Sequence, residues 1–270
     1  MPRLQPSADV VRLDTEDKMK TPKMILFDCG NTLLCEPGLD FLRGYEALMR
    51  YAVKNPQNLT PEQIKEFSTG LFQQKQTVRD LGFEIHGWQF NRFVYEYLGI
   101  EFSVSIPEAE KILWDNVSTG ALMPNVENML DYINAKGIRS GVISNIGWSG
   151  AALTERINQL LPRNRFEFII ASSDYMFRKP RPLLFELALK KAGLDAEDVW
   201  YCGDSVVNDV EGSAAVGIFP VWYEDKTKDN PWREQEKGIV PTCEHLHIHD
   251  WDELIRVLGG LSDNVKTDCP

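Results

Sequence analysis

The strongest constraint on the fold is a regular alternation of helical and strand-like segments after Pro124. A helical stretch with Val126, Met129, Leu130 and Ile133 on one face is followed by the apolar stretch IRSGVIS. The alternation continues through GAALTERINQL, FEFIIAS, RPLLFELALKKAG, DVWYCGD, NDVEGSAAVG and IFPVWY. This pattern is typical of a parallel sheet with helices on both faces, so we expect an α/β protein.

Residues 39–118 follow a different pattern, which is helical almost throughout. Thr60 with Gln63, and Ser105 with Glu108, have the spacing of capping boxes at helix starts. We find no convincing strand in this block. Because the strand-like stretch KMILFD precedes it, we expect a helical unit inserted after the first strand of the α/β domain.

The predicted domain boundaries follow from these two patterns. We expect residues 21–38 and 119–262 to form the α/β core, and residues 39–118 to form the helical insert. Residues 1–20 and 263–270 are predicted to be tails, the first of them flexible.

Charge and composition exclude several functions. The 270 residues carry a net charge of −11, which argues against a nucleic-acid or anionic-membrane surface. No apolar run reaches the roughly 18 to 20 residues that span a bilayer, and the polar first 20 residues lack the apolar region of a secretion signal. Five cysteines, an odd number without paired metal spacing, indicate reduced thiols. We therefore expect a cytoplasmic protein.

Polar residues stand at or just after the ends of four predicted strands. They are Asp28, Ser144 with Asn145, Lys179, and Asp204 with Asp209. Ligands of open parallel sheets bind outside the carboxyl ends of the strands, so we expect these residues to converge. Converging carboxylates repel one another unless a cation compensates them, and Mg²⁺ suits oxygen ligands of this kind. A carboxylate beside Mg²⁺ and an ammonium group can attack a phosphoryl group.

Four ordered motifs, LFDCGNTL, GVISN, FRKPRPLLFELAL and WYCGDSVVNDVEGS, resemble those of the haloacid dehalogenase superfamily of aspartate-nucleophile hydrolases. The resemblance extends from about Met24 to Val257. It implies a Rossmann-like core, and it implies that the insert at residues 39–118 is the helical cap that closes over the active site in one subclass.

The resemblance also implies a role for each residue of the motifs. Asp28 is the nucleophile that forms an aspartyl-phosphate, and Lys179 neutralises the developing charge. The phosphate-binding residues are Thr32, Ser144, Asn145 and Lys179, and the Mg²⁺ ligands are Asp28, the carbonyl of Gly30, Asp204 and Asp209.

The sequence departs from the family pattern at Gly30, where phosphatases usually carry a second aspartate as general acid and base. Loss of a general acid typically costs about 10²- to 10⁴-fold in rate. The interpretation we favour is a Mg²⁺-dependent phosphatase of a small phosphorylated metabolite with a good leaving group. A proton donor from the cap, with His86 as the first residue to test, is a second explanation.

Three alternatives remain open. Family branches without the acid include dehalogenases, but these lack the Mg²⁺ carboxylate that corresponds to Asp204. Phosphonate hydrolases need a cap lysine, and we interpret Lys54, Lys65 and Lys75 as solvent-facing. The chain could also be a weakly active phosphate-binding or interaction protein.

Two further features of the sequence have both a functional and a structural interpretation. Trp148 either lines the substrate pocket or packs under the cap. His245, His247 and His249 alternate, which places them on one face of a short strand far along the chain from the motifs. We interpret these histidines as structural or surface residues.

Overall fold

The computed structural model describes residues 19–225 and 236–264. The predicted tails at residues 1–20 and 263–270 therefore lie outside the described residues, except for residues 19–20 and 263–264. Within the described ranges, every helix is too short or too polar to cross a membrane. The four cysteines found there, Cys29, Cys35, Cys202 and Cys243, are free thiols.

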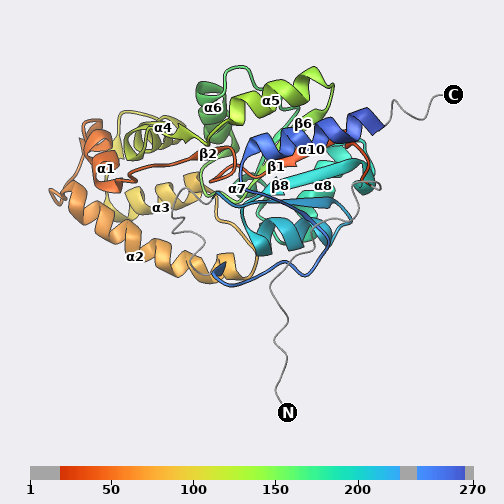
Figure 1. Ribbon diagram of the computed structural model, residues 1–270. Helices are drawn as coiled ribbons and strands as arrows, with labels where there is room; N and C mark the ends of the chain where they lie inside the picture. Colours follow the sequence, from red (N-terminus) through yellow and green to blue (C-terminus); the bar gives the residue numbers. More distant parts are fainter. Residues whose placement is uncertain (1–18, 226–235, 265–270) are drawn as a thin grey trace, which may run out of the picture.

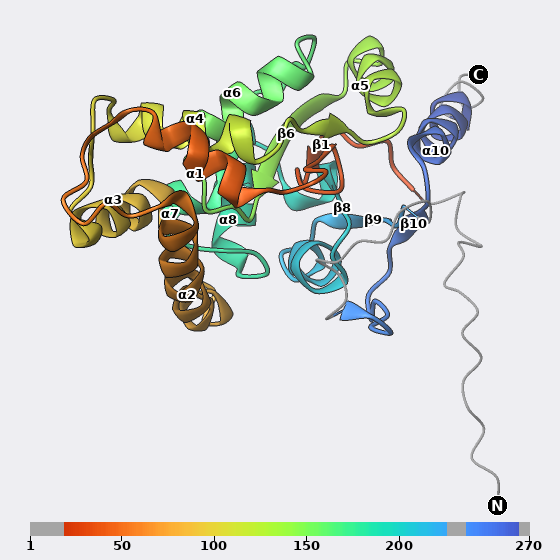
Figure 2. The ribbon, with the colours of Figure 1, turned by 90° about the vertical axis from the view of Figure 1, so that its left-hand side faces the viewer.

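A parallel sheet forms the centre of the molecule, with strand order β10-β9-β8-β1-β6-β7 among the described residues (Figures 1 and 2). All its neighbouring strands pair in parallel, which confirms the predicted α/β class. The strands are β1 (Met24–Phe27), β6 (Arg139–Ser144), β7 (Ile169–Ala171), β8 (Val199–Gly203), β9 (Phe219–Tyr223) and β10 (Leu246–Ile248).

Helices cover both faces of this sheet. Ile25 and Phe27 belong to the hydrophobic cluster under α5 (Val126–Ala135), α6 (Gly150–Leu160) and α10 (Trp251–Asn264). Met24 and Leu26 point to the other face, where they pack with α8 (Pro182–Ala192). Burial on both faces explains why β1 is a continuous apolar run. Figure 1 shows α5 and α10 on the same side of the sheet.

Short segments complete the core between these larger elements. They are α7 (Ser172–Tyr175), a 3₁₀ turn at Ala196–Asp198, a helical turn at Val206–Glu211, and α9 (Gly212–Ala214).

The helical insert forms a separate hydrophobic cluster to one side of the sheet (Figure 2). Its helices are α1 (Phe41–Met49), α2 (Pro61–Asp80), α3 (Gly87–Leu98) and α4 (Ile106–Val117). Both predicted capping boxes are confirmed, since Thr60 and Ser105 begin α2 and α4 with reciprocal hydrogen bonds to Gln63 and Glu108.

The prediction that this block contains no strand is wrong. Strand β3 (Ala52–Lys54) pairs antiparallel with β4 (Glu101–Phe102) at the edge of the insert. These strands are three and two residues long and partly exposed, so they carry too little alternation to be recognised.

A second short antiparallel pair joins the two connections between the insert and the core. Strand β2 (Leu34–Cys35) pairs with β5 (Ala121–Leu122), and the backbone N–H of Met123 donates to the carbonyl of Leu33. The chain therefore enters and leaves the insert at neighbouring points.

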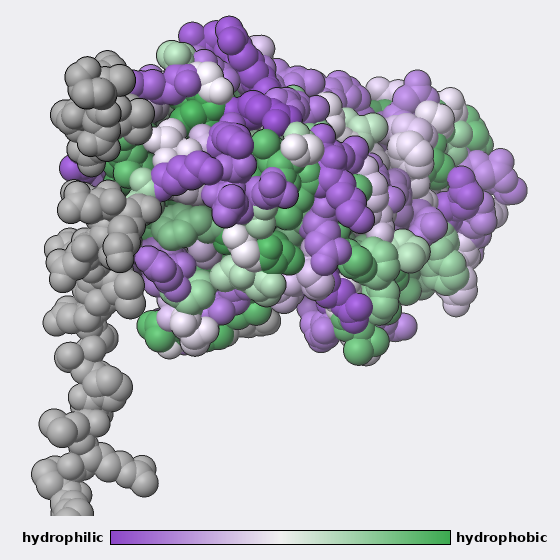
Figure 3. Space-filling model, turned by 90° about the vertical axis from the view of Figure 1, so that its right-hand side faces the viewer, coloured by the Kyte–Doolittle hydropathy of each residue, from purple (hydrophilic) through white to green (hydrophobic). Residues whose placement is uncertain are grey.

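The surface on the side opposite the insert is mixed in character. Figure 3 shows apolar patches scattered between hydrophilic residues on this face.

Candidate functional site

Three residues from separate motifs meet at the carboxyl edge of the sheet. Asp28 directly follows β1, Lys179 lies in the loop before α8, and Asp209 lies in the helical turn after β8. Nζ of Lys179 donates to Oδ1 of Asp28 at 2.6 Å and to Oδ1 of Asp209 at 2.7 Å. All three side chains are buried. The predicted convergence of these motifs is thus observed.

Asp204 completes a group of three carboxylates. It directly follows β8, and oxygens of Asp28, Asp204 and Asp209 lie within 4.8 Å of one another. Gly203 makes the close approach of Asp209 possible, because a Cβ at residue 203 would lie 2.4 Å from the Asp209 carboxyl carbon. The N–H of Ser205 donates to Oδ2 of Asp209 at 2.9 Å, which fixes its orientation.

The charge state of Lys179 follows from its surroundings. Burial lowers the pKa of Lys179, but the charges of Asp209 and Asp28 outweigh burial and raise that pKa above its ordinary value. The side chain is therefore an ammonium group at neutral pH. Its ammonium group contacts Asp28 and Asp209, two of the three carboxylates, and a divalent cation bound by the oxygens of all three would reduce their mutual repulsion.

Tyr201 is a site residue that the sequence analysis missed. Its hydroxyl accepts a hydrogen bond from Nζ of Lys179 at 2.5 Å and lies 3.3 Å from Oδ1 of Asp209. The residue is fully buried in β8. Its one sequence signal is weak: a tyrosine within a buried strand needs a partner for its hydroxyl group.

Thr32 and Ser144 provide buried hydroxyl groups near this edge of the sheet. Thr32 lies in the turn after β1, and its Oγ1 is buried with no hydrogen-bond partner among the described residues. Ser144 is the last residue of β6 and is also buried. An unsatisfied buried hydroxyl is costly, so Oγ1 of Thr32 suits a ligand oxygen.

Asn145 contacts the loop of Lys179 with both ends of its side chain. Nδ2 of Asn145 donates to the Lys179 carbonyl at 2.8 Å, and Oδ1 accepts from the Lys179 N–H at 2.8 Å. The amide therefore holds the backbone of the lysine, whereas the sequence analysis placed it on phosphate.

Gly30 is exposed, and no atom lies within 4 Å of the position that a Cβ would occupy. The left-handed conformation of the turn belongs to the next residue, Asn31, with φ of 55°. Neither backbone conformation nor crowding therefore requires glycine at residue 30.

The loop that carries Lys179 pairs with the helical insert. Phe83 forms an antiparallel bridge with Phe177. The N–H of Glu84 donates to the Met176 carbonyl at 2.6 Å, and the N–H of Arg178 donates to the Gly82 carbonyl at 3.1 Å. The insert thus contacts the residue next to Lys179.

Glu84 is the centre of a buried ionic cluster at this contact. Its fully buried carboxylate pairs with Lys75 at 2.8 Å, with Arg79 at 3.5 Å and with Arg178. Burial raises the pKa of Glu84, but Arg178, Lys75 and Arg79 outweigh burial and hold that pKa below its ordinary value. The interpretation of Lys75 as solvent-facing is therefore wrong, although Lys54 and Lys65 are exposed.

His86 and Trp148 also have defined positions. His86 caps α3: its Nδ1 accepts from the N–H of Trp88 at 3.0 Å, and its Nε2 lies 3.3 Å from Asp174. Both ring nitrogens therefore have partners away from Asp28. Trp148 stacks on Trp114 of α4 at 5.0 Å between ring centroids, so it packs under the insert.

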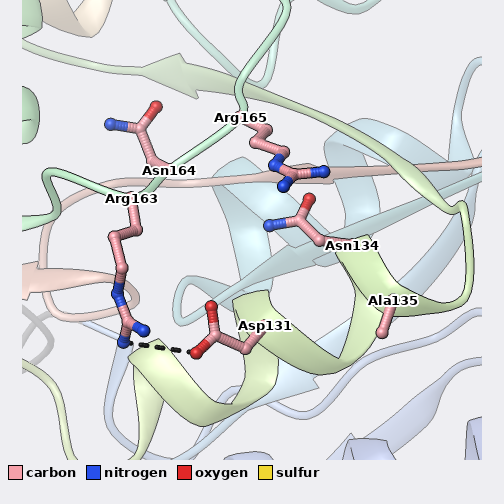
Figure 4. Close-up of a pocket in the computed structure, with 6 residues that line it drawn as sticks. All are labelled: Asp131, Asn134, Ala135, Arg163, Asn164 and Arg165. Atoms are coloured by element: carbon pink, nitrogen blue, oxygen red, sulfur yellow. Dashed lines mark ion pairs between the residues drawn. The ribbon is translucent and has the colours of Figure 1, made fainter.

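A surface cavity of about 570 Å³ lies away from these residues (Figure 4). Residues of α5 and of the segment before β7 line it, and Arg163 pairs there with Asp131 at 3.2 Å. These segments lead into the amino ends of β6 and β7, which is the edge of the sheet opposite Asp28. This cavity is not part of the candidate site.

Comparison with known proteins places the chain in a family. Residues 25–222 match the family described as haloacid dehalogenase-like hydrolase. A similar curated protein is the glyceraldehyde 3-phosphate phosphatase of Pyrococcus abyssi, which is 24% identical over 204 residues, or 74% of this chain and 81% of that protein.

Two solved structures show the same fold. The HAD phosphatase from Thermococcus onnurineus has a TM-score of 0.58 and 20% identity, and the match covers 90% of this chain and 99% of that one. The 2-haloacid dehalogenase from Pseudomonas syringae has a TM-score of 0.56 and 21% identity, with 89% and 98% covered. The chain belongs to the haloacid dehalogenase-like hydrolase family and is an enzyme of that fold.

Proposed function

We propose that this member of the haloacid dehalogenase-like hydrolase family is a Mg²⁺-dependent phosphatase of a small phosphorylated metabolite. The observation that carries the proposal is the group formed by Asp28, Asp204 and Asp209, of which Asp28 and Asp209 accept hydrogen bonds from the ammonium of Lys179. The similarity to the glyceraldehyde 3-phosphate phosphatase of Pyrococcus abyssi supports a small phosphorylated substrate.

Asp28 acts as the nucleophile in this proposal. Its carboxylate attacks the phosphorus atom, and the bond from phosphorus to the leaving oxygen breaks, which gives an aspartyl-phosphate. Because residue 30 carries no acid, the leaving oxygen takes its proton from water. A second water then attacks the phosphorus atom, releases phosphate and restores the Asp28 carboxylate.

Asp28, Asp204, Asp209 and the carbonyl of Gly30 would hold the Mg²⁺. When bound, the ion supplies positive charge beside the phosphoryl oxygens. Lys179 neutralises further charge, and the hydroxyls of Thr32 and Ser144 bind phosphoryl oxygens. We assign Asn145 to the positioning of Lys179, because both ends of its amide contact the lysine backbone.

We further propose that residues 39–118 are a cap that selects the substrate. The bridge between Phe83 and Phe177 and the stacking of Trp114 on Trp148 support this role, since both bring the insert to loops of the site. Exclusion of water and selection of substrate are common functions of such elements. The free thiols support the expected cytoplasmic location.

Gly30 and the similarity to a 2-haloacid dehalogenase favour a second candidate, cleavage of a carbon–halogen bond. Asp204 opposes it, because that chemistry needs no carboxylate cluster for a metal. A phosphonate hydrolase using Lys75 is disfavoured, because this ammonium pairs with the buried Glu84.

Turnover of an aryl phosphate with and without Mg²⁺ tests the proposal. We expect chelation or Asp204→Asn to lower turnover by about 100-fold or more, because the metal would supply much of the charge stabilisation. Asp195→Asn, at an exposed position, is the matched control and should change nothing. Full turnover in chelator would contradict the role of Mg²⁺, and hydrolysis of a 2-haloacid under the same conditions would favour the dehalogenase.

A further inference from the structure

Five polar or aromatic residues share one face at the β9–β10 end of the sheet. Trp222 is opposite His247 in the register of the two strands, while their neighbours Val221, Tyr223, Leu246 and Ile248 point into the core. Because side chains alternate along strands, Glu224 follows Trp222 on this face, and His245 and His249 flank His247 on it.

The side chains of Glu224, His247 and His249 converge on one point. Nε2 of His247 lies 3.1 Å from Oε2 of Glu224, and Nδ1 of His249 lies 3.7 Å from the same oxygen. One ligand atom from each residue lies within 4.8 Å of the others. Two ligand atoms that are each about 2.1 Å from a tetrahedral ion are about 3.4 Å apart, so these spacings fit such an ion.

We propose that Glu224, His247 and His249 form a second metal site, for Zn²⁺ or a similar transition-metal ion. Two imidazoles and one carboxylate are a common ligand set for Zn²⁺, and water would take the remaining position. A proton held on a ligating nitrogen goes to solvent when the ion binds.

The ligand types separate this site from the one at Asp28. Imidazole nitrogens suit Zn²⁺, Co²⁺ or Ni²⁺, whereas the carboxylate group of Asp28, Asp204 and Asp209 suits Mg²⁺. The two sites should therefore load with different ions from a mixture.

Packing around His247 restricts its ring in the orientation that the site needs. Trp222 stacks on this ring with 4.0 Å between centroids and 12° between the planes. Glu224 directly follows β9 and His249 directly follows β10, so a bound ion would clip the carboxyl ends of these two strands together. Among the described residues, β10 is an edge strand that pairs only with β9. A metal ion bound between these two strands would therefore stabilise the edge of the sheet.

Titration of the full-length protein with Co²⁺ and Zn²⁺, in saturating Mg²⁺, tests the proposal. We expect one Co²⁺ per chain with the visible spectrum of nitrogen and oxygen ligands, displaced by Zn²⁺. His247→Gln and Glu224→Gln should each weaken metal binding by ~100-fold. Mutation of a residue that only hydrogen-bonds to a metal ligand already lowers the affinity by about 10- to 100-fold, so loss of a ligand should cost at least as much.

His245→Gln is the matched control, because His245 lies on the same face but is not one of the three residues whose ligand atoms lie within 4.8 Å of one another. It should change the affinity less than about 3-fold. Zn²⁺ should also raise the melting temperature of the wild type but not of His247→Gln. Absence of binding to the wild type, equal affinity in His247→Gln, or a thiolate absorption band that places Co²⁺ on cysteine would each overturn the proposal.

Discussion

Gly30 is the residue at which the proposed active site differs from most phosphatases of its family. It is exposed, its backbone lies outside the left-handed region, and a Cβ there would touch nothing. Glycine is therefore not a requirement of the fold, and its chemical consequence is that residue 30 supplies no acid to the leaving group. The rate should then depend on how easily the leaving group departs.

Gly30→Asp should supply the missing acid. We expect wild-type rates to fall steeply as the leaving-group pKa rises, and the variant to hydrolyse alkyl phosphates ~10-fold faster or more. A series of aryl and alkyl phosphates measures this dependence.

Gly30→Asn is the control, because it fills the same space without an acid. Mg²⁺ affinity must be measured in both variants, since an added carboxylate can disturb the ionisation of Asp28. A shallow dependence in the wild type would show that a proton donor already acts from elsewhere, and this account of Gly30 would be wrong.

For individual residues, the sequence predicted the site residues that follow the ends of strands. It did not predict residues whose role depends on contacts between side chains from different elements. Asp28, Lys179 and Asp209 were found because parallel strands bring their carboxyl ends to one edge. Tyr201 and Glu224 were missed, since their importance depends on which neighbours their side chains meet in three dimensions.

The element that connects the insert to the site is the segment between α2 and α3. It contacts the loop before Lys179 through the bridge between Phe83 and Phe177 and through the ion pair of Glu84 with Arg178. Helix caps in the insert were predictable because they depend on residues three positions apart. The contact between the insert and the lysine loop was not predictable, because it joins residues far apart in the sequence. Glu84 and Arg178, for example, are 94 positions apart.

Glu84→Gln should weaken this connection. Removal of one charge from a buried ion cluster leaves the others uncompensated, so we expect the free energy of unfolding at pH 7 to fall by about 3 kcal/mol. Urea denaturation measures it, with Glu66→Gln at an exposed position of α2 as the control.

The pH dependence of this difference has a defined sign. Because the pKa of Glu84 is lower in the folded protein, its contribution is complete above the ordinary glutamate pKa of about 4.3 and is lost as the pH falls through the folded-state pKa. The difference between wild type and Glu84→Gln should therefore be constant from pH 7 to about pH 5 and shrink below that. A difference that grew on acidification would contradict the ionised cluster.

In the described part of the chain, an α/β sheet is interrupted after β1 by a helical unit with its own hydrophobic cluster. This organisation was predictable because the change in periodicity at both ends of the insert is strong. The position of the insert against the lysine loop was not predictable, because hydrophobic periodicity does not show which surfaces of two units pack together.

Replacement of residues 39–118 by a short linker tests whether the insert is a cap. Strands β2 and β5 already pair where the insert joins the core, so the shortened chain should fold and retain the sheet. We expect the ratio of turnover between small and bulky phosphates to approach one, as judged by kcat/KM across a substrate set. Circular dichroism checks the fold, and unchanged discrimination would show that the insert does not select the substrate.

Detection of a phosphoryl group on Asp28 would test the proposed covalent mechanism directly. The protein is mixed with a good substrate and Mg²⁺, quenched in acid during turnover, digested and analysed by mass spectrometry. A covalent mechanism through Asp28 predicts one phosphoryl group on the peptide that contains Asp28, absent in Asp28→Asn and absent when Mg²⁺ is chelated. Steady turnover by Asp28→Asn, or a phosphoryl group on another residue, would contradict it.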